Sequence, residues 1–114
     1  MNKVFSAAQN GHVYRIDKFH VPEHARAEFL KRARATHDLL RKQPGFVREL
    51  LLEQVGGPGE FNIVTLVEWE SDKAIEQAKE KVTAMHMQIN FDPQELRARL
   101  GIRTDLGNYR LLDA

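Results

Sequence analysis

The segment FNIVTLVEWES, residues 61–71, decides the fold of this chain. Alternate residues of a β-strand point to opposite faces of a sheet, so the segment divides into two rows of side chains. One row consists of Phe61, Ile63, Thr65, Val67 and Trp69, and the other of Asn62, Val64, Leu66 and Glu68. Both rows are largely apolar, which predicts a strand with apolar contacts on each face of its sheet.

The flanking segments predict three more strands and three helices. Ser71 is a good N-cap and Asp72 suits the first turn, so a helix begins where this strand ends. The predicted strands are His12–Val21, Phe46–Val55, Phe61–Glu70 and Leu106–Leu112, and the predicted helices are Pro22–Leu40, Ser71–Ile89 and Asp92–Leu100. This order is a split β-α-β arrangement. We therefore expect an α+β, ferredoxin-like fold with a four-stranded antiparallel sheet and helices on one face.

Length and composition indicate one domain. The chain has 114 residues, of which 42% are hydrophobic, and no repeat or linker interrupts it after Gly11. We expect residues 1–11 to form a flexible arm and residues 12–114 to fold as a single domain.

Charge and cysteine content exclude several classes of function. Seventeen basic and 16 acidic residues leave a net charge of +1, so we expect neither a nucleic-acid partner nor a membrane partner. No apolar run approaches the roughly 20 residues of a membrane span, and no signal peptide is recognisable, which predicts a cytoplasmic protein. The absence of cysteine excludes disulfides, thiolate zinc sites and thiol catalysis. Pro22 separates His20 from His24, so we expect no metal site.

The apolar character of both sheet faces predicts a homodimer. The segment 46–55 places Phe46, Leu50 and Leu52 on one side and Val47, Leu51 and Val55 on the other. Two main helices cover only one face of four strands, and the other face would leave a large apolar patch in water. A second copy packed sheet against sheet would cover it.

Several motifs, in a fixed order, resemble the antibiotic biosynthesis monooxygenase family. They are a strand ending in Phe19 and Val21 before Pro22-Glu23, then Phe29, Gln43-Pro44-Gly45-Phe46, and Val67-Glu68-Trp69-Glu70-Ser71 with Ala74. The resemblance spans residues 13–89 and implies a dimeric α/β barrel of ferredoxin-like subunits. It also implies an oxygenase without a cofactor, acting on an electron-rich aromatic such as a phenol, anthrone or quinol.

The resemblance also directs attention to particular residues. Family members that oxidise aromatic polyketides carry an Asn four residues before the strand Trp and a Tyr six residues after it. Here Trp69 is present, and those two positions are Thr65 and Ile75. Haem-degrading relatives carry a second Trp about nine residues after the strand Trp, which is Ala78 here, and a helix His to which His86 lies near in sequence.

We expect the catalytic residues to be His37, His86 and Trp69. A histidine has an ordinary pKa near neutrality and can act as a general base, and His37 lies in the apolar stripe of the first helix. Trp69 is expected to form a wall of the cavity. Each of the three also has a purely structural interpretation, as a buried or surface-edge side chain.

Substrate-binding candidates lie on the strands. They are Tyr14, Arg15, Asn62 and Thr65, polar side chains among apolar neighbours. Arg15 and Asp17 share a face, which permits a cross-strand ion pair or hydrogen bonds inside a cavity.

Three functions follow from these candidates. The first is a cofactor-independent monooxygenase of a small aromatic or quinol-type substrate, bound in an apolar cavity between helices and sheet. The second is a non-catalytic dimer that binds an aromatic metabolite or haem, or serves in a stress response. The third is a cofactor-free isomerase or lyase that uses the same histidine.

Overall fold

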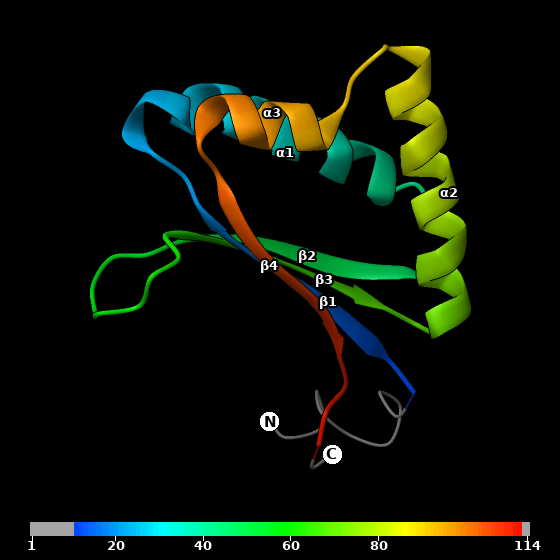
Figure 1. Cartoon of the computed structure of the whole chain (residues 1–114). Helices are drawn as coiled ribbons and strands as arrows, with labels where there is room; N and C mark the ends of the chain where they lie inside the picture. Colours follow the sequence, from blue (N-terminus) through cyan, green and yellow to red (C-terminus); the bar gives the residue numbers. More distant parts are fainter. Residues whose placement is uncertain (1–10, 113–114) are drawn as a thin grey trace.

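The computed structural model describes residues 11–112 and has two layers, a sheet and a set of helices on one of its faces (Figure 1). The four strands lie in the order β2-β3-β1-β4, and every neighbouring pair is antiparallel. The strands are β1 (Val13–His20), β2 (Phe46–Glu53), β3 (Ile63–Trp69) and β4 (Arg103–Tyr109). The helices are α1 (Arg26–Leu40), α2 (Asp72–Gln88) and α3 (Pro93–Leu100), with a short 3-10 turn, η3 (Glu23–Ala25), before α1. The predicted ferredoxin-like α+β fold is confirmed.

Strand β3 positions the two parts of the core. Its row facing the helices is Ile63, Thr65, Val67 and Trp69, all buried. Ile63 belongs to a cluster with Phe29, Leu30 and the buried side chains of α3, whereas Val67 and Trp69 belong to a second cluster with the start of α2. Thr65 lies between the two clusters and is the one polar residue of this row.

A tight corner joins β2 and β3 to α2. Gly45 has φ +86°, and a Cβ at this position would lie 2.4 Å from Cβ of Ala74, so only glycine fits here. The carbonyl of Gly45 accepts a hydrogen bond from the amide of Glu70 at 2.8 Å. The hydroxyl of Ser71 caps α2 by accepting from the amide of Ala74 at 3.1 Å, as the sequence predicts.

The last strand differs from the prediction. It runs over Arg103–Tyr109 instead of Leu106–Leu112, because Gly101 ends α3 in the left-handed conformation and the chain turns directly into pairing with β1. The polar residues Thr104 and Asp105 therefore belong to the strand. These two residues are in the strand because they pair with β1, and not because of their own preference for extended backbone.

The prediction of the faces of β2 is wrong at its first residue. A bulge between Phe46 and Arg48 shifts the register, so Phe46 faces the helices beside Trp69 while Leu50 and Leu52 face away. The helix-facing row of β2 thus contains Phe46, Glu49 and Leu51.

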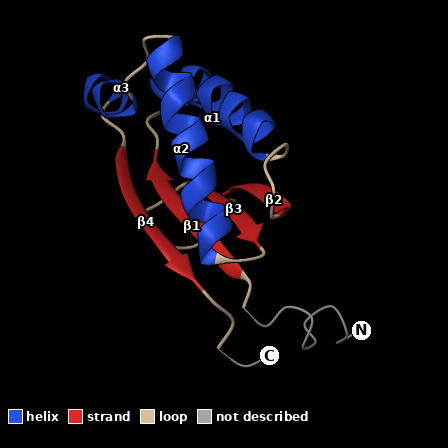
Figure 2. Cartoon of the chain, turned by 90° about the vertical axis from the view of Figure 1, so that its right-hand side faces the viewer, coloured by secondary structure: helices blue, strands red, loops and turns tan. Residues whose placement is uncertain are grey.

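Helix α2 packs against the sheet at its N-terminal end and diverges from the sheet toward its C-terminal end. Its first half is buried at Ile75 and Ala78, whereas Met87 and Ile89 at its far end are 76% and 53% exposed. Figure 2 shows α2 in front of the sheet, rising toward α1 and α3. No helix within residues 11–112 is long and apolar enough to cross a membrane.

The sheet face opposite the helices is apolar and uncovered. Leu50, Leu52 and Tyr109 are 41%, 47% and 46% exposed on it. The side chains of Ile16, Val64 and Leu66 on the same face are only half-buried. Apolar side chains therefore lie on both faces of the sheet, as the sequence predicts, and the face without helices also carries Lys18 and the Arg48–Glu68 pair.

Candidate active site

A cavity with two lobes lies between the helices and the sheet. The Trp69 lobe has a volume of about 170 Å³, and the Phe91 lobe about 140 Å³. The Trp69 lobe is lined by Arg15, Asp17, Thr36, His37, Leu40, Thr65, Val67, Trp69, Ile75, Ala78, Lys79 and Val82. The Phe91 lobe is lined by Asp17, Phe19, Phe29, Arg32, Ala33, Thr36, His37, Thr65, His86, Phe91, Pro93, Leu96 and Arg97. Four residues line both lobes and mark their junction: Asp17, Thr36, His37 and Thr65.

The size of each lobe suits an aromatic ring. A dry cavity of about 150 Å³ is large enough to bind benzene. Each lobe therefore has the volume for one aromatic ring, and the shared lining residues place the two lobes next to each other.

His37 lies at the junction and is held by a carboxylate. The residue is 7% exposed, and its Nδ1 lies 2.5 Å from Oε1 of Glu49 on β2. The other oxygen of Glu49 accepts a hydrogen bond from Arg41, which also pairs with Asp38. An imidazole that donates from Nδ1 to a carboxylate keeps its Nε2 as a proton acceptor. An imidazole held in this way can accept a proton at Nε2 from a molecule that reaches it.

Trp69 forms part of the wall of its lobe and also belongs to the core. Its side chain is 2% exposed, and Phe46 packs edge-on against it with ring centroids 5.8 Å apart. Ile75 and Ala78 of α2 complete this apolar wall.

Arg15 and Asp17 of β1 form an ion pair inside the cavity. Both side chains face the helices, and Nε of Arg15 lies 2.5 Å from Oδ1 of Asp17. Asn108 of β4 accepts a weaker hydrogen bond from Arg15 at 3.4 Å. The predicted shared face is confirmed, although the pair runs along one strand.

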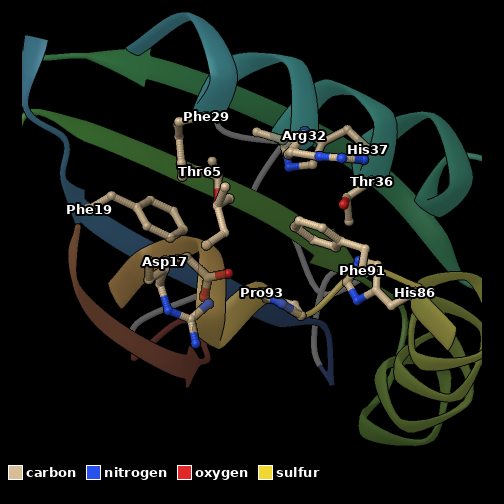
Figure 3. Close-up of a pocket in the computed structure, with 13 residues that line it drawn as sticks. Asp17, Phe19, Phe29, Arg32, Thr36, His37, Thr65, His86, Phe91 and Pro93 are labelled. Carbon is tan, nitrogen blue, oxygen red and sulfur yellow. The ribbon is translucent and has the colours of Figure 1, made fainter. Parts of the chain in front are cut away.

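The Phe91 lobe has a different character. His86 packs edge-on against Phe91 at a centroid distance of 5.1 Å, and the guanidinium of Arg32 lies 4.3 Å from the centre of the Phe91 ring. Burial lowers the pKa of His86, and the charge of Arg32 lowers it further. His86 is therefore neutral at pH 7. Figure 3 shows Arg32, Thr36 and His37 on one side of the cavity and Asp17 and Phe19 on the other, with Phe91 and His86 beside them.

Two predicted substrate-binding residues do not line this cavity. Tyr14 faces the opposite side of the sheet, where its hydroxyl contacts Oε2 of Glu68 at 3.4 Å. Burial and the neighbouring Glu68 charge raise the pKa of Tyr14. Asn62 precedes β3 and joins it to the end of β1, donating to the carbonyl and accepting from the amide of Val21, both at 2.8 Å.

The remaining predicted residues meet at the cavity. His37, Trp69, Arg15 and Thr65 line the Trp69 lobe, and His86 lines the Phe91 lobe. Sequence reasoning missed Glu49, because it lies twelve positions from His37 on another element and no local spacing connects them. It also missed Arg32 and Phe91, which come together only when the segment after α2 folds back toward α1. Among the described residues, no group of three His, Asp or Glu side chains is arranged to hold a metal ion.

The solved structures that share this fold include those of the following three proteins. A protein of Shewanella loihica PV-4 is 19% identical with a TM-score of 0.69, covering 91% of this chain and 97% of its own. The cofactor-independent oxygenase SnoaB of Streptomyces nogalater is 21% identical with a TM-score of 0.63, covering 91% and 96%. The haem degrader MhuD of Mycobacterium tuberculosis, solved with two haems in its active site, is 24% identical with a TM-score of 0.67, covering 90% and 97%.

A search of curated protein sequences found no match. The family model described as antibiotic biosynthesis monooxygenase matches residues 12–86, which contain β1 to β3, α1 and most of α2. The match covers more than half of the chain and includes both histidines of the cavity. This chain belongs to the antibiotic biosynthesis monooxygenase family.

Proposed function

We propose that the protein is a cofactor-independent monooxygenase of a small hydroxylated aromatic compound, with His37 as its general base. The observation that carries this proposal is the buried His37, paired with Glu49 and placed at the junction of two ring-sized lobes. A base at this place can reach a hydroxyl or an acidic C–H group of a ring bound in either lobe. SnoaB, which has the same fold, is a cofactor-independent oxygenase, which agrees with this chemistry.

The reaction balances without an added reductant. His37 Nε2 takes a proton from the phenol, anthrone or quinol, and the resulting carbanion donates electrons to O₂ and forms a C–O bond. The imidazolium returns its proton to the distal oxygen, giving a hydroperoxide. Loss of the remaining proton on that carbon breaks the O–O bond, so that one oxygen stays as a carbonyl and the other leaves as water.

The side chains of the cavity position the substrate and stabilise the negative charge that develops on its oxygen. Trp69, Val67 and Ile75 surround the ring and exclude water, which strengthens electrostatic interactions inside the lobe. The hydroxyl of Thr65 and the guanidinium of Arg15 line the same lobe and are the donors that stabilise the substrate oxyanion. Glu49 positions the ring of His37 and stabilises its protonated form.

The active protein is a homodimer in this proposal. Leu50 and Leu52 are exposed on the sheet face that carries no helix, beside the half-buried Val64 and Leu66. A second copy of the chain on this face would remove these side chains from water, which is the driving force for association.

Oxygen consumption tests the proposed function. Chelator-treated protein is incubated with anthrone, catechol or a hydroquinone under ¹⁸O₂, and the product is analysed by mass spectrometry. We expect protein-dependent uptake with one labelled oxygen atom in the product. Binding of these aromatics without any uptake would contradict the proposal and favour a binding protein, whereas conversion without oxygen would indicate an isomerase or lyase.

A further inference from the structure

The charge of the cavity lining differs from that of the whole chain. Basic and acidic residues nearly balance over the sequence, 17 against 16. The two lobes, however, are lined by the cations Arg15, Arg32, Lys79 and Arg97 and by a single acid, Asp17. Since Asp17 is paired with Arg15, the cavity retains an excess of positive charge.

Arg32 and Arg97 concentrate this charge at the Phe91 lobe. Within residues 11–112, neither guanidinium forms a salt bridge with a carboxylate, although Arg26, Arg41, Arg48, Arg99 and Arg103 all do. Both residues are half-buried and line the lobe. Two half-buried cations that line the same lobe repel each other, and an anion between them would relieve that repulsion.

Arg32 is also in contact with an aromatic ring of the lobe. Its guanidinium packs on the ring of Phe91 at 4.3 Å, which restricts the side chain. A guanidinium is a planar set of N–H donors that matches a carboxylate with two parallel hydrogen bonds. His86 lies beside it, and its lowered pKa, to which the Arg32 charge contributes, agrees with a positive field in this lobe.

We propose that Arg32 and Arg97 bind a carboxylate carried by the substrate, so that the substrate is an aromatic hydroxy acid. This inference rests on the proposed function, because it uses the same cavity and places the hydroxylated ring at His37. Arg32 and His37 are five positions apart on α1, about 7.5 Å along the helix axis. Both residues line the Phe91 lobe, so one ligand in this lobe can present a carboxylate to Arg32 and a hydroxyl to His37.

A matched ligand pair tests the inference. The probes are 1,4-dihydroxy-2-naphthoate and its methyl ester, which share their rings and hydroxyls and differ in charge. Anaerobic calorimetric titration gives the Kd of each probe for the wild type, Arg32→Gln, Arg97→Gln and Arg34→Gln. Arg34 is the control because it lies on α1, is exposed and lines neither lobe.

We expect the acid to bind the wild type at least tenfold more tightly than the ester, because a hydrogen-bonded charge pair contributes on this scale. Arg32→Gln and Arg97→Gln should each weaken binding of the acid about tenfold and leave binding of the ester unchanged. Arg34→Gln should behave as the wild type. Added salt should weaken binding of the acid only.

The outcomes separate this inference from the proposed function. Equal affinity for acid and ester, no binding of either, or no effect of Arg32→Gln and Arg97→Gln would overturn the inference, even if oxygen uptake occurs. Selective binding of the acid that depends on both arginines would support it. If that binding is accompanied by no oxygen uptake, the carboxylate site stands and the monooxygenase proposal fails.

Discussion

Glu49 of β2 holds the imidazole of His37 on α1, with 2.5 Å between Oε1 and Nδ1. This contact joins a strand and a helix across the open part of the core, where Thr65 separates the two apolar clusters. It fixes the orientation of the ring, and the second carboxylate oxygen is in turn held by Arg41. The proposed base is therefore positioned by residues that do not themselves line the cavity.

Replacing Glu49 tests this positioning role. Glu49→Gln removes the negative charge that orients His37 and stabilises its protonated form. We expect kcat for oxygen uptake to fall about tenfold or more, with KM nearly unchanged, because general base catalysis contributes about 100-fold to 10,000-fold. Glu53→Gln is the control, since Glu53 lies on the same strand and pairs with the exposed Arg26. An equal loss in both variants, or a change in KM alone, would contradict the role of Glu49.

Leu66→Asp tests the proposed dimer. Leu66 lies on the sheet face without helices, directly opposite Leu50 in the register of β2 and β3. A carboxylate at this position would be buried without a partner in a sheet-to-sheet interface, which is strongly unfavourable. We expect light scattering to give the mass of a dimer for the wild type and of a monomer for the variant. Val55→Asp, at a fully exposed loop residue, should remain dimeric. A wild type that is monomeric would refute the dimer.

Asn62→Ala distinguishes a structural residue from a substrate-binding one. The substitution removes two hydrogen bonds to the backbone of Val21, and we expect the free energy of unfolding to fall by about 1–3 kcal/mol. The activity per folded molecule should not change, because Asn62 does not line the cavity. Chemical denaturation and oxygen uptake measure the two effects. A raised KM with unaltered stability would show that Asn62 contacts the substrate.

The pKa of His86 predicts a pH dependence of stability. Its pKa is lowered in the folded state from an ordinary value of 6.5, so the unfolded chain binds a proton more readily than the folded chain. The free energy of unfolding should therefore decrease as the pH falls below about 6.5. Urea denaturation at pH 8.0 and at pH 5.5 should show a smaller decrease for His86→Gln than for the wild type. The same decrease in both proteins would assign the effect to other groups.

Much of the fold could be predicted because local signals agree with the tertiary structure. The apolar rows of residues 61–71, the cap at Ser71 and the stop at Gly101 each determine structure within a few residues. The limits of β4 and the facing of Phe46 could not be predicted in this way. They depend on pairing with β1 and on a bulge against β3, and both are contacts between distant segments.

The candidate site was predictable in part for the same reason. The apolar stripe of α1 indicates which way His37 points, and the alternation of β1 places Arg15 beside Asp17. Glu49 and Arg32 carry no local signal, since an acid on a strand and an arginine on a helix are ordinary surface residues. Their roles come from the contacts with His37 and Phe91. Tyr14 has a strand context similar to that of Arg15, but its side chain lies on the opposite face.

The most direct test of the central claim is the rate of oxygen consumption by His37→Gln. The measurement uses chelator-treated protein and the best substrate of the aromatic panel, with His24→Gln as a control at an exposed histidine next to α1. Trp69→Phe in the same assay reports on the wall of the cavity. If His37 is the base, its substitution should reduce the rate by about 100-fold or more, while His24→Gln retains the wild-type rate. A His37→Gln protein that is folded and consumes oxygen at the wild-type rate would contradict the account.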